Sequence, residues 1–481
     1  MSEQLSSTQK RYAWIRSAIE RRSASTFGIV LVVVLGLIGA VQGLPNWFSI
    51  LVVTGVIAYE FQKRLDQGVP LLQLTCLIAV LQWLVGPLLS YSSDNPIERY
   101  TMSVPAEQYF RFAIPATALY VAVMLFAGAS VIQKNLLQQI DRRKFFTIGV
   151  LLNIVAIIAA FAATRVSGSL AFLLHLISQM RYVGAIYFLL SRSQVRLVFA
   201  GLSCIQLFSG SLGAGMFHDM ILWLAILFCY WFAQKKRTTL FKTVVLAATT
   251  VSLFSIQVVK QEYRQQLRQG AQPNLFRLVI DYVTPGGQAW ETGVLSLAIT
   301  RLNQGWIISA VMWNVPENEP FAGGETVKQA VLGSLVPRFL WADKAKAGGR
   351  ESFRRFTGLR ILDSTSMAIS PLGEAYANFG ELWGTIFMVA FGSFFAVFYR
   401  LTLWHCLKYP TFLFWIPLIF YQAIKAETEL LVIMNQLVKG SVVAFGCHFL
   451  VEKVFPTRIR NLTPANPAGA QPTGVGFNVS P

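Results

Sequence analysis

Apolar stretches dominate the chain and alternate with short polar segments. Before residue 260 the apolar runs are 27–61, 69–91, 112–132, 145–163, 169–190, 197–233 and 243–259, and after residue 384 they are 385–404, 411–424 and 429–451. Several runs reach the roughly 20 residues that a helix needs to cross a bilayer. Gly43-Leu44-Pro45-Asn46 divides the first run into two. The pattern predicts an all-α polytopic integral membrane protein.

Lys and Arg gather in every second connecting segment. This bias is typical of membrane proteins, whose basic loops lie on the cytoplasmic side. Basic segments should all lie on the cytoplasmic side, so the chain crosses the membrane an even number of times between one basic segment and the next. Counted in this way, the apolar runs predict about twelve transmembrane helices and two cytoplasmic termini. The predicted regions are a basic cytoplasmic tail (1–26), a block of about nine helices (27–259), a large periplasmic loop with interfacial helices (260–384), the last three helices (385–451) and a cytoplasmic, disordered tail (452–481).

Composition agrees with this class and argues against several others. The chain is 54% hydrophobic and 13% charged, which is about half the charge of an average soluble protein. The net charge of +18 is divided among short segments, so no continuous basic face for nucleic acid is expected. No His or Cys grouping has metal-ligand spacing. We expect no metal and no cofactor.

Two cations fall inside predicted spans, namely Arg181 and Lys439. A charge near the bilayer midplane costs several kcal/mol, so it normally faces a cavity or a partner. A functional role and simple pairing with polar neighbours such as Ser178 or Asn435 explain them equally well. Acids are absent from the middle of the spans, which lowers the case for an ion-driven transporter.

The long polar loop carries the main candidate chemistry. Residues 261–283 have the spacing of an amphipathic surface helix, and 290–314 are apolar enough to lie in the interface or against the bundle. The run PRFLWADKAKAGGRESFRRFTGLR (Pro337 to Arg360) follows. Its cations are Arg338, Lys344, Lys346, Arg350, Arg354, Arg355 and Arg360. The paired N–H donors of an arginine guanidinium match the geometry of phosphate oxygens, so the run predicts an anionic ligand. Anionic lipid headgroups are the alternative. Trp341 among the cations favours a substrate.

Carboxylates stand on both sides of the cation run. Ser370-Pro371 predicts a helix start, and Glu374, Asn378 and Glu381 would then share one helix face. Glu374 is the first candidate for a general base and Glu325 the second. Glu374 would equally well stabilise its helix N-terminus or pair with an arginine.

The block from Val336 to Gly384, with PRFLWADKAKAGG and then TSMAISPLGEAYANFG leading into a span, resembles the late periplasmic loop of bacterial Wzy-type oligosaccharide repeat-unit polymerases. These are the O-antigen and exopolysaccharide polymerases. The predicted layout of twelve spans and one large late loop is similar to theirs. The resemblance implies a GT-C-like membrane glycosyltransferase of the bacterial inner membrane.

The implied reaction transfers a growing glycan from undecaprenyl pyrophosphate to a new lipid-linked repeat unit. Loop cations would contact the pyrophosphate, which maps to Arg338, Lys344, Arg350, Arg354 or Arg355. Arg301, Asn378 and Trp341 complete the predicted substrate site. Membrane lipid, a flippase and a chain-length regulator are the implied partners. The chain departs from the family at Ser209-Gly210-Ser211-Leu212, where many relatives have an arginine.

Two other functions compete with the polymerase. An O-antigen ligase-like glycosyltransferase would use a loop histidine, and all four His here lie outside 260–384. A flippase or exporter of lipid-linked glycans would need a cationic cavity among the spans and not the long loop.

Overall fold

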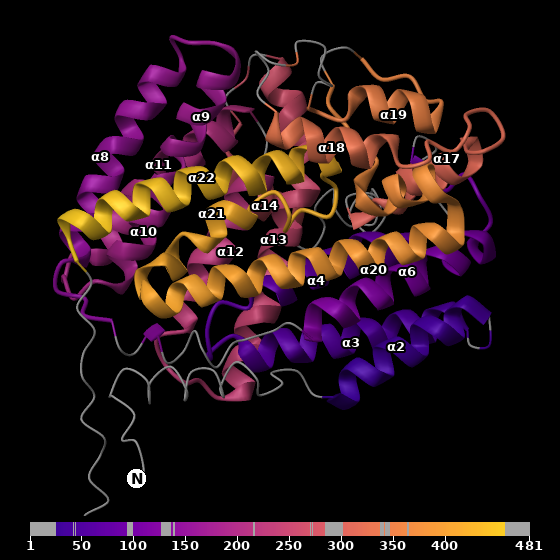
Figure 1. Cartoon of the computed structure of the whole chain (residues 1–481), viewed down its shortest axis with the longest axis horizontal. Helices are drawn as coiled ribbons and strands as arrows, with labels where there is room; N and C mark the ends of the chain where they lie inside the picture. The colour runs from indigo at the N-terminus through magenta and orange to yellow at the C-terminus, as the bar shows by residue number, and fades with distance from the viewer. Residues whose placement is uncertain are drawn as a thin grey trace, which may run out of the picture.

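The computed structural model describes residues 26–41, 43, 45–93, 100–126, 136–137, 140–214, 217–269, 271, 273–283, 302–336, 341, 347–362 and 365–456. Within these residues the regular elements are helices, and no strand is present (Figure 1). Seven helices are long and apolar enough to cross a membrane, and four shorter apolar helices accompany them. The predicted class, an all-α membrane protein, is therefore confirmed. Of the predicted tails, residues 1–25 and 457–481 lie outside the described residues, while 452–454 are helical and form the end of the last helix.

The helices follow the predicted apolar runs. In chain order they are α2 (Thr26–Val41), α3 (Asn46–Arg64), α4 (Leu71–Val80), the π-helical η1 (Leu81–Val85), α5 (Gly86–Tyr91), α6 (Ala106–Phe126), α8 (Phe145–Ala163), α9 (Gly168–Ser178), α10 (Met180–Leu190), α11 (Arg196–Ala214), α12 (His218–Phe232), α13 (Thr239–Arg268), α14 (Leu275–Val283), α17 (Gly305–Asn314), α18 (Glu325–Leu335), α19 (Arg350–Thr357), α20 (Ser370–Lys408), the 3-10 helix η3 (Pro410–Phe414), α21 (Ile416–Phe420) and α22 (Leu430–Val454). The predicted break near residue 45 separates α2 from α3.

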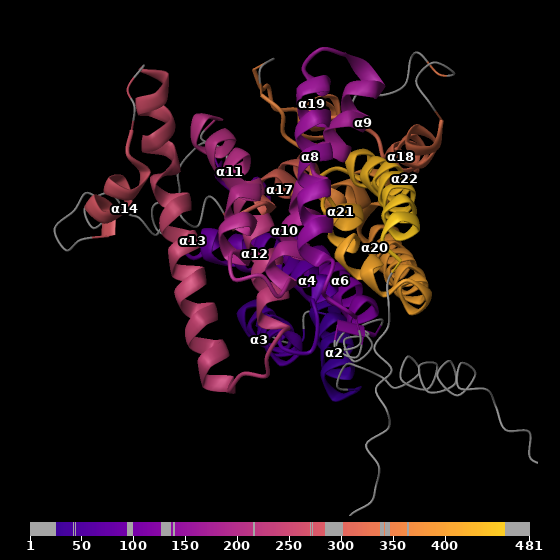
Figure 2. The same cartoon turned by 90° about the vertical axis from the view of Figure 1, so that its left-hand side faces the viewer.

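Helix α6 lies between α2 and α20 (Figures 1 and 2). Small residues allow both neighbours to approach it closely. A Cβ added to Gly36 of α2 would lie 2.8 Å from the Cβ of Ala118, and one added to Gly392 of α20 would lie 2.7 Å from Val123. Close backbone approach through small residues is how membrane helices maximise van der Waals contact.

The outer face of α8 shows why the bundle needs a bilayer. Ile157 and Ile158 are each 62% exposed, and Phe161 on the same helix is 63% exposed. A contiguous apolar face of this kind is unfavourable in water and normal against lipid. The exposed face of α8 is therefore the surface expected to contact acyl chains.

Helix α17 joins the long loop to the bundle. Its residues Ile308 and Val311 are fully buried. The backbone N–H of Gln304, just before α17, donates to the carbonyl of Gln82 in η1 at 3.1 Å. A π-turn displaces carbonyls from the regular helical ladder and leaves them open to such partners. This part of the predicted interfacial stretch packs against the bundle, which was one of its two expected placements.

Helix α20 is interrupted at Gly380. The backbone there has φ 69° and ψ −161°, which is not helical, so the run divides into a first segment (370–379) and a long second segment (381–408). A positive φ costs glycine little because it has no Cβ. The hydroxyl of Ser370 accepts a hydrogen bond from the N–H of Gly373 at 3.3 Å, as predicted for a Ser-Pro helix start.

Two stretches differ from the predicted pattern. Residues 411–424, predicted as a span, form η3 and the short α21, and both together are shorter than a bilayer is thick. The amphipathic stretch 261–283 is divided between the end of α13 and α14. Proline at 410 and 417 explains the first difference, because it interrupts helical hydrogen bonding.

A buried ion pair ties α13 to the end of α3. The Nζ of Lys242 lies 3.0 Å from a carboxylate oxygen of Asp66, and both side chains are buried. Lys242 also donates to the carbonyl of Gln62 at 3.3 Å. The pair therefore anchors α13, which stands at the edge of the bundle in Figure 2.

Candidate functional site

A cleft of about 300 Å³ lies between α18, α19, the first segment of α20 and the start of α22. We name it the loop cleft. Its lining residues are Glu325, Thr326, Gln329, Trp341, Gly349, Glu351, Ser352, Arg355, Phe356, Glu374, Glu429 and Leu431. Figure 1 shows α18 beside one end of α22, with α19 close by. The cleft brings together four predicted site residues, namely Glu374, Glu325, Arg355 and Trp341.

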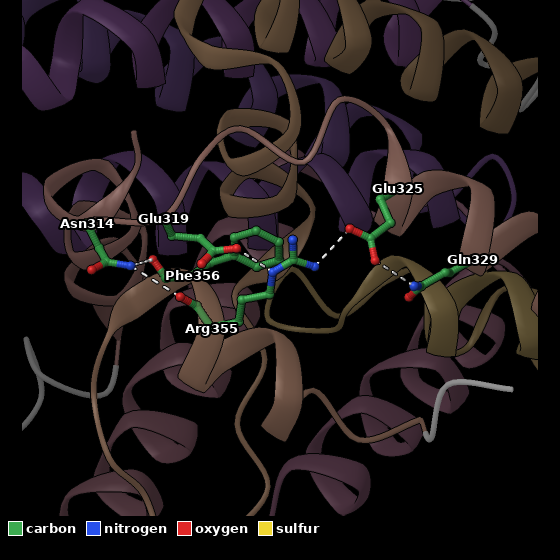
Figure 3. Close-up of polar contacts among 6 residues, drawn as sticks. All are labelled: Asn314, Glu319, Glu325, Gln329, Arg355 and Phe356. Atoms are coloured by element: carbon green, nitrogen blue, oxygen red, sulfur yellow. Dashed lines mark hydrogen bonds and ion pairs between the residues drawn. The ribbon is translucent and has the colours of Figure 1, made fainter. Parts of the chain in front are cut away.

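The short helix α19 presents Arg355 to the loop cleft. Its beginning depends on Gly349, which has φ 72° and therefore a left-handed backbone. At its other end the Nδ2 of Asn314 donates to the carbonyls of Arg355 and Phe356, at 3.2 and 3.1 Å (Figure 3). The last carbonyls of a helix have no partner within it, so Asn314 stabilises this end of α19.

Arg355 bridges two carboxylates. Its Nε lies 2.6 Å from Glu319 and its Nη1 lies 2.9 Å from Glu325, while the guanidinium carbon lies 4.8 Å from the centre of the Phe356 ring. Gln329 donates to the other oxygen of Glu325 at 3.0 Å (Figure 3). Hydrogen bonds to Glu319 and Glu325 raise the pKa of Arg355 above its usual value. Its charge is thus compensated within the cleft.

Glu374 is buried, with 3% of its surface exposed. Its Oε1 accepts a hydrogen bond from the backbone N–H of Leu430 at 2.7 Å, at the N-terminus of α22. Its carboxyl is also hydrogen-bonded to the side chain of Thr326. Among the described residues, no Lys or Arg forms an ion pair with Glu374. The carboxylate is therefore held by neutral donors, one of them at a helix N-terminus.

Asn378 connects elements behind the loop cleft. Its Oδ1 accepts from the N–H of Gly324 at 3.1 Å, and its Nδ2 donates to the hydroxyl of Thr326 and to the carbonyl of Glu374, each at 2.7 Å. Asn378 is almost fully buried and does not line the cleft. It was predicted to bind substrate, and the structure instead places it where it positions Thr326 and Glu374.

The predicted common face of Glu374, Asn378 and Glu381 is wrong for Glu381. The break at Gly380 turns the chain between them. Glu381 forms an ion pair with Arg111 of α6, with Nη2 and Oε1 2.6 Å apart. A helical spacing rule holds only while the helix continues, and Gly380 ends it.

Glu429 was not predicted as a site residue, although it lines the loop cleft. It is 4% exposed, and its Oε1 accepts from the N–H of Gly348 at 2.7 Å. Burial raises the pKa of Glu429, and hydrogen bonds from the Gly348 and Gly349 N–H groups oppose that rise. The signal in the sequence was an acid directly before an apolar run that begins at Leu430.

The predicted loop cations do not converge on the cleft within the described residues. The Nε of Arg350 donates to the carbonyl of Thr365 at 3.2 Å, and Arg354 donates to the carbonyl of Ile361. Neither lines the cleft. Three other predicted substrate-binding cations lie outside the described residues, namely Arg338, Lys344 and Arg301.

The described part of the loop cleft is acidic. Its charged side chains are four glutamates and one arginine, Arg355. Carboxylates accept hydrogen bonds, and the cleft adds the aromatic side chains of Trp341 and Phe356. Acceptor oxygens beside aromatic faces suit a ligand that is rich in hydroxyl groups. They do not suit a pyrophosphate.

A second cavity, of about 660 Å³, lies among α8 to α12. We name it the Arg181 cavity. Its lining residues are Ala160, Ala163, Thr164, Ala171, Phe172, His175, Ser178, Gln179, Arg181, Tyr182, Gln206, Leu207, Gly210, Ser211, Asp219, Trp223 and Tyr421. The candidate span Leu170–Leu190 contains Arg181 near its middle, as predicted.

The guanidinium of Arg181 is held at a helix break. A turn at Gln179 separates α9 from α10, and the Nε of Arg181 donates to the carbonyl of Ser178 at 2.7 Å. Arg181 is 7% exposed, and among the described residues no carboxylate forms an ion pair with it. A buried cation with a neutral partner, facing a cavity, is the arrangement expected for a site that receives an anion.

Aromatic rings form one wall of the Arg181 cavity. The rings of Tyr182 and Trp223 have centroids 4.5 Å apart, and Trp223 stacks on Tyr421 at 5.0 Å. The other predicted intramembrane cation, Lys439, lies beyond a different wall, where its Nζ is 5.0 Å from the centre of the Phe172 ring. Lys439 also donates to Asn435 at 2.8 Å. Arg181 thus lines the cavity, and Lys439 contacts one of the lining residues, Phe172.

Residues 421–431 contribute to both cavities, because Tyr421 lines the Arg181 cavity while Glu429 and Leu431 line the loop cleft. An ion pair and a histidine–carboxylate contact fasten this segment to the start of α12. Lys425 lies 2.7 Å from Asp219, and Glu427 lies 3.3 Å from the Nδ1 of His218. One short, tethered segment therefore contributes side chains to both the loop cleft and the Arg181 cavity.

The described residues contain no group of three or more His, Cys, Asp or Glu side chains placed to bind a metal ion. All five cysteines are free thiols. The polar groups that line the two cavities in the described part of the chain are carboxylates, amides, hydroxyls, the imidazole of His175 and the guanidinium groups already described.

Comparison with curated proteins finds no significant match, and comparison with solved structures finds none either. One family matches residues 96–402, a range that contains the Arg181 cavity helices α8 to α12 and most of the loop cleft, but not Glu429. That range covers more than half of the chain. The chain therefore belongs to the family described as a domain of unknown function (DUF8712).

Proposed function

We propose that this protein is a glycosyltransferase of the bacterial inner membrane that polymerises lipid-linked oligosaccharide repeat units. It transfers glycan from undecaprenyl pyrophosphate to an acceptor repeat unit at the periplasmic face. The proposal includes a GT-C-like architecture, cytoplasmic termini and twelve crossings, of which the one at 411–424 would be made by η3, α21 and the turns after them and not by one helix. One observation carries it: a cleft with a buried carboxylate and a cavity with a buried cation are each lined by one end of residues 421–431.

The loop cleft is assigned to the acceptor sugar. Glu374 takes the proton from the acceptor hydroxyl as that oxygen bonds to the anomeric carbon of the donor. Glu325 is less suited to this role, because it is ion-paired with Arg355 and also bonded to Gln329. Glu374 is held by neutral donors, the Leu430 N–H and the side chain of Thr326.

The Arg181 cavity is assigned to the lipid-linked donor. As the anomeric carbon leaves the pyrophosphate oxygen, negative charge grows on the leaving group. A preorganised guanidinium stabilises that charge, and the fork of Arg181 offers further donors beyond its bond to Ser178. The aromatic wall of Tyr182, Trp223 and Tyr421 would contact the apolar chain or the first sugar.

A second function, a flippase or exporter of lipid-linked glycans, is favoured by the same Arg181 cavity. A cationic cavity among spanning helices is what such a transporter needs. The buried carboxylate of the loop cleft has no role in that function. The two proposals therefore differ in what they require of Glu374.

The test compares variants in a strain that lacks the chromosomal gene and makes the lipid-linked repeat unit. Glu374→Gln keeps the size of the side chain and removes the base. Its control is Glu317→Gln, an exposed acid on the same loop outside the cleft. Protein levels are measured for both by immunoblotting.

Loss of a general base typically lowers a rate by about 10²- to 10⁴-fold. We expect Glu374→Gln to lose the ladder of long glycans while single repeats still reach the cell surface, and Glu317→Gln to keep the ladder. Arg181→Gln is expected to lose the ladder as well. If single repeats fail to reach the surface in the deletion strain, the transporter is correct and the polymerase is not.

A further inference from the structure

A groove of about 350 Å³ runs over α6 between α2 and α20. Its walls are apolar side chains at helical spacing, including Val33 on α2, Val123 on α6 and Val389 and Val397 on α20. Arg400 is the last residue of α20 in its lining. None of these residues lines the loop cleft or the Arg181 cavity.

The groove is as long as one leaflet of a bilayer. From Val389 to Arg400 a helix advances about 16 Å at about 1.5 Å per residue. This is about half of the roughly 30 Å hydrocarbon thickness. Val397 at the rim of the groove is 57% exposed, so the apolar wall is open to whatever lies alongside the helices. A straight acyl chain has the polarity and the length for this groove.

Arg400 supplies a charge at one end. Its Nη2 donates to the carbonyl of Phe126, the last residue of α6, at 3.1 Å. Its guanidinium carbon lies 5.9 Å from the centre of the Phe126 ring. These contacts hold the positively charged guanidinium at the end of the groove.

We infer that this groove binds one acyl chain of an anionic glycerophospholipid, with the phosphate of the lipid headgroup at Arg400. The argument joins an apolar channel of one-leaflet length to a cation at its end, which complements an anionic headgroup. The inference concerns a site apart from both cavities and does not depend on the proposed function.

The charge sets the expected size of the effect. A basic residue near a membrane surface contributes about 1 kcal/mol toward anionic lipid, which corresponds to roughly five-fold in affinity. The wild-type protein should therefore retain phosphatidylglycerol over phosphatidylcholine by roughly that factor.

The experiment uses the purified full-length chain with each lipid in turn and counts retained lipids by native mass spectrometry. Arg400→Gln removes the charge, and Ser393→Phe fills the groove, which Ser393 lines. Arg165→Gln is the matched control. Arg165 also lies over a phenylalanine ring, that of Phe161, and donates to its carbonyl, but it lines none of the three sites.

We expect Arg400→Gln to lose the roughly five-fold preference, Ser393→Phe to retain less of both lipids, and Arg165→Gln to match wild type. A phosphatidylglycerol with a photoreactive acyl chain should label peptides of α2, α6 or α20. Wild-type lipid retention in both groove variants would overturn the inference. So would labelling confined to other helices, or a crosslink that shows a second copy of the chain in the groove.

Discussion

Replacing Glu429 by alanine should open the loop cleft without unfolding the bundle. Glu429 stands directly before α22 and accepts the N–H of Gly348, next to the start of α19. The bond joins a membrane helix to the loop segment that carries Arg355. Glu429→Ala removes the acceptor and leaves the Gly348 N–H without it. Glu429→Gln keeps an acceptor oxygen in nearly the same place.

The magnitude follows from burial and from the charge of the acceptor. A hydrogen bond to a charged group contributes about 1.5–3 kcal/mol, and Glu429 is nearly fully buried, so water replaces the bond poorly. At about 1.4 kcal/mol per factor of ten, the equilibrium for local opening of α19 should rise roughly 10- to 100-fold. Glu429→Gln should raise it less, because its amide oxygen can still accept the Gly348 N–H.

Limited trypsin digestion measures this opening, since α19 contains three arginines. When reclosing is faster than cleavage, the initial rate of cutting follows the population of the open form. Glu427→Ala is the control, because Glu427 belongs to the same segment but pairs with His218 and is half exposed. Cleavage of Glu429→Ala at the wild-type rate would refute the reasoning, as would equal rates for the alanine and glutamine variants.

Three further predictions concern stability. Burial raises the pKa of Glu429, so the carboxyl ionises at a lower pH in the unfolded chain than in the folded one. As the pH rises from about 4.3 to the raised pKa, wild type should therefore lose stability relative to Glu429→Gln. Thermal unfolding at pH 4 to 8 should show unfolding midpoints that diverge between the two proteins, and parallel midpoints would contradict the prediction. Gly349→Ala puts a Cβ 2.5 Å from the carbonyl oxygen of Met367. The φ of 72° at this position adds a cost of about 1–2 kcal/mol for any residue with a Cβ. Trypsin should therefore cut α19 faster than in wild type, and an unchanged rate would exclude a structural need for glycine. Lys242→Met leaves the carboxylate of Asp66 buried without its cation, so the free energy of unfolding in detergent should fall by about 3 kcal/mol, whereas the double change with Asp66→Leu should recover most of the loss.

Local rules predicted the features that depend on neighbours along the chain. The apolar runs became helices, the break near Pro45 separated α2 from α3, and Ser370 accepts the N–H of Gly373 at its helix start. Each of these follows from hydropathy or backbone chemistry within a few residues. Rules of the same kind failed beyond Gly380, because a single non-helical residue sends Glu381 to Arg111 and away from Glu374.

The candidate site was predicted in part. Glu374, Glu325, Arg355 and Trp341 do line one cleft. The expected convergence of loop cations does not occur among the described residues, because Arg350 and Arg354 bind backbone carbonyls of the same loop. Which carbonyl an arginine reaches depends on how the loop folds back, and no spacing along the sequence contains that information.

The sequence by itself determined that this protein is a helical membrane protein and that its polar chemistry is concentrated in one late loop and in a few intramembrane cations. Hydropathy is a sum over adjacent residues, so it can be evaluated without the fold. Only the tertiary structure decided that Glu429 joins Glu374 in the loop cleft, that Arg181 faces a cavity, and that residues 421–431 border both. Those arrangements depend on packing between helices that are far apart in the chain, and burial and pairing of charges are properties of that packing alone.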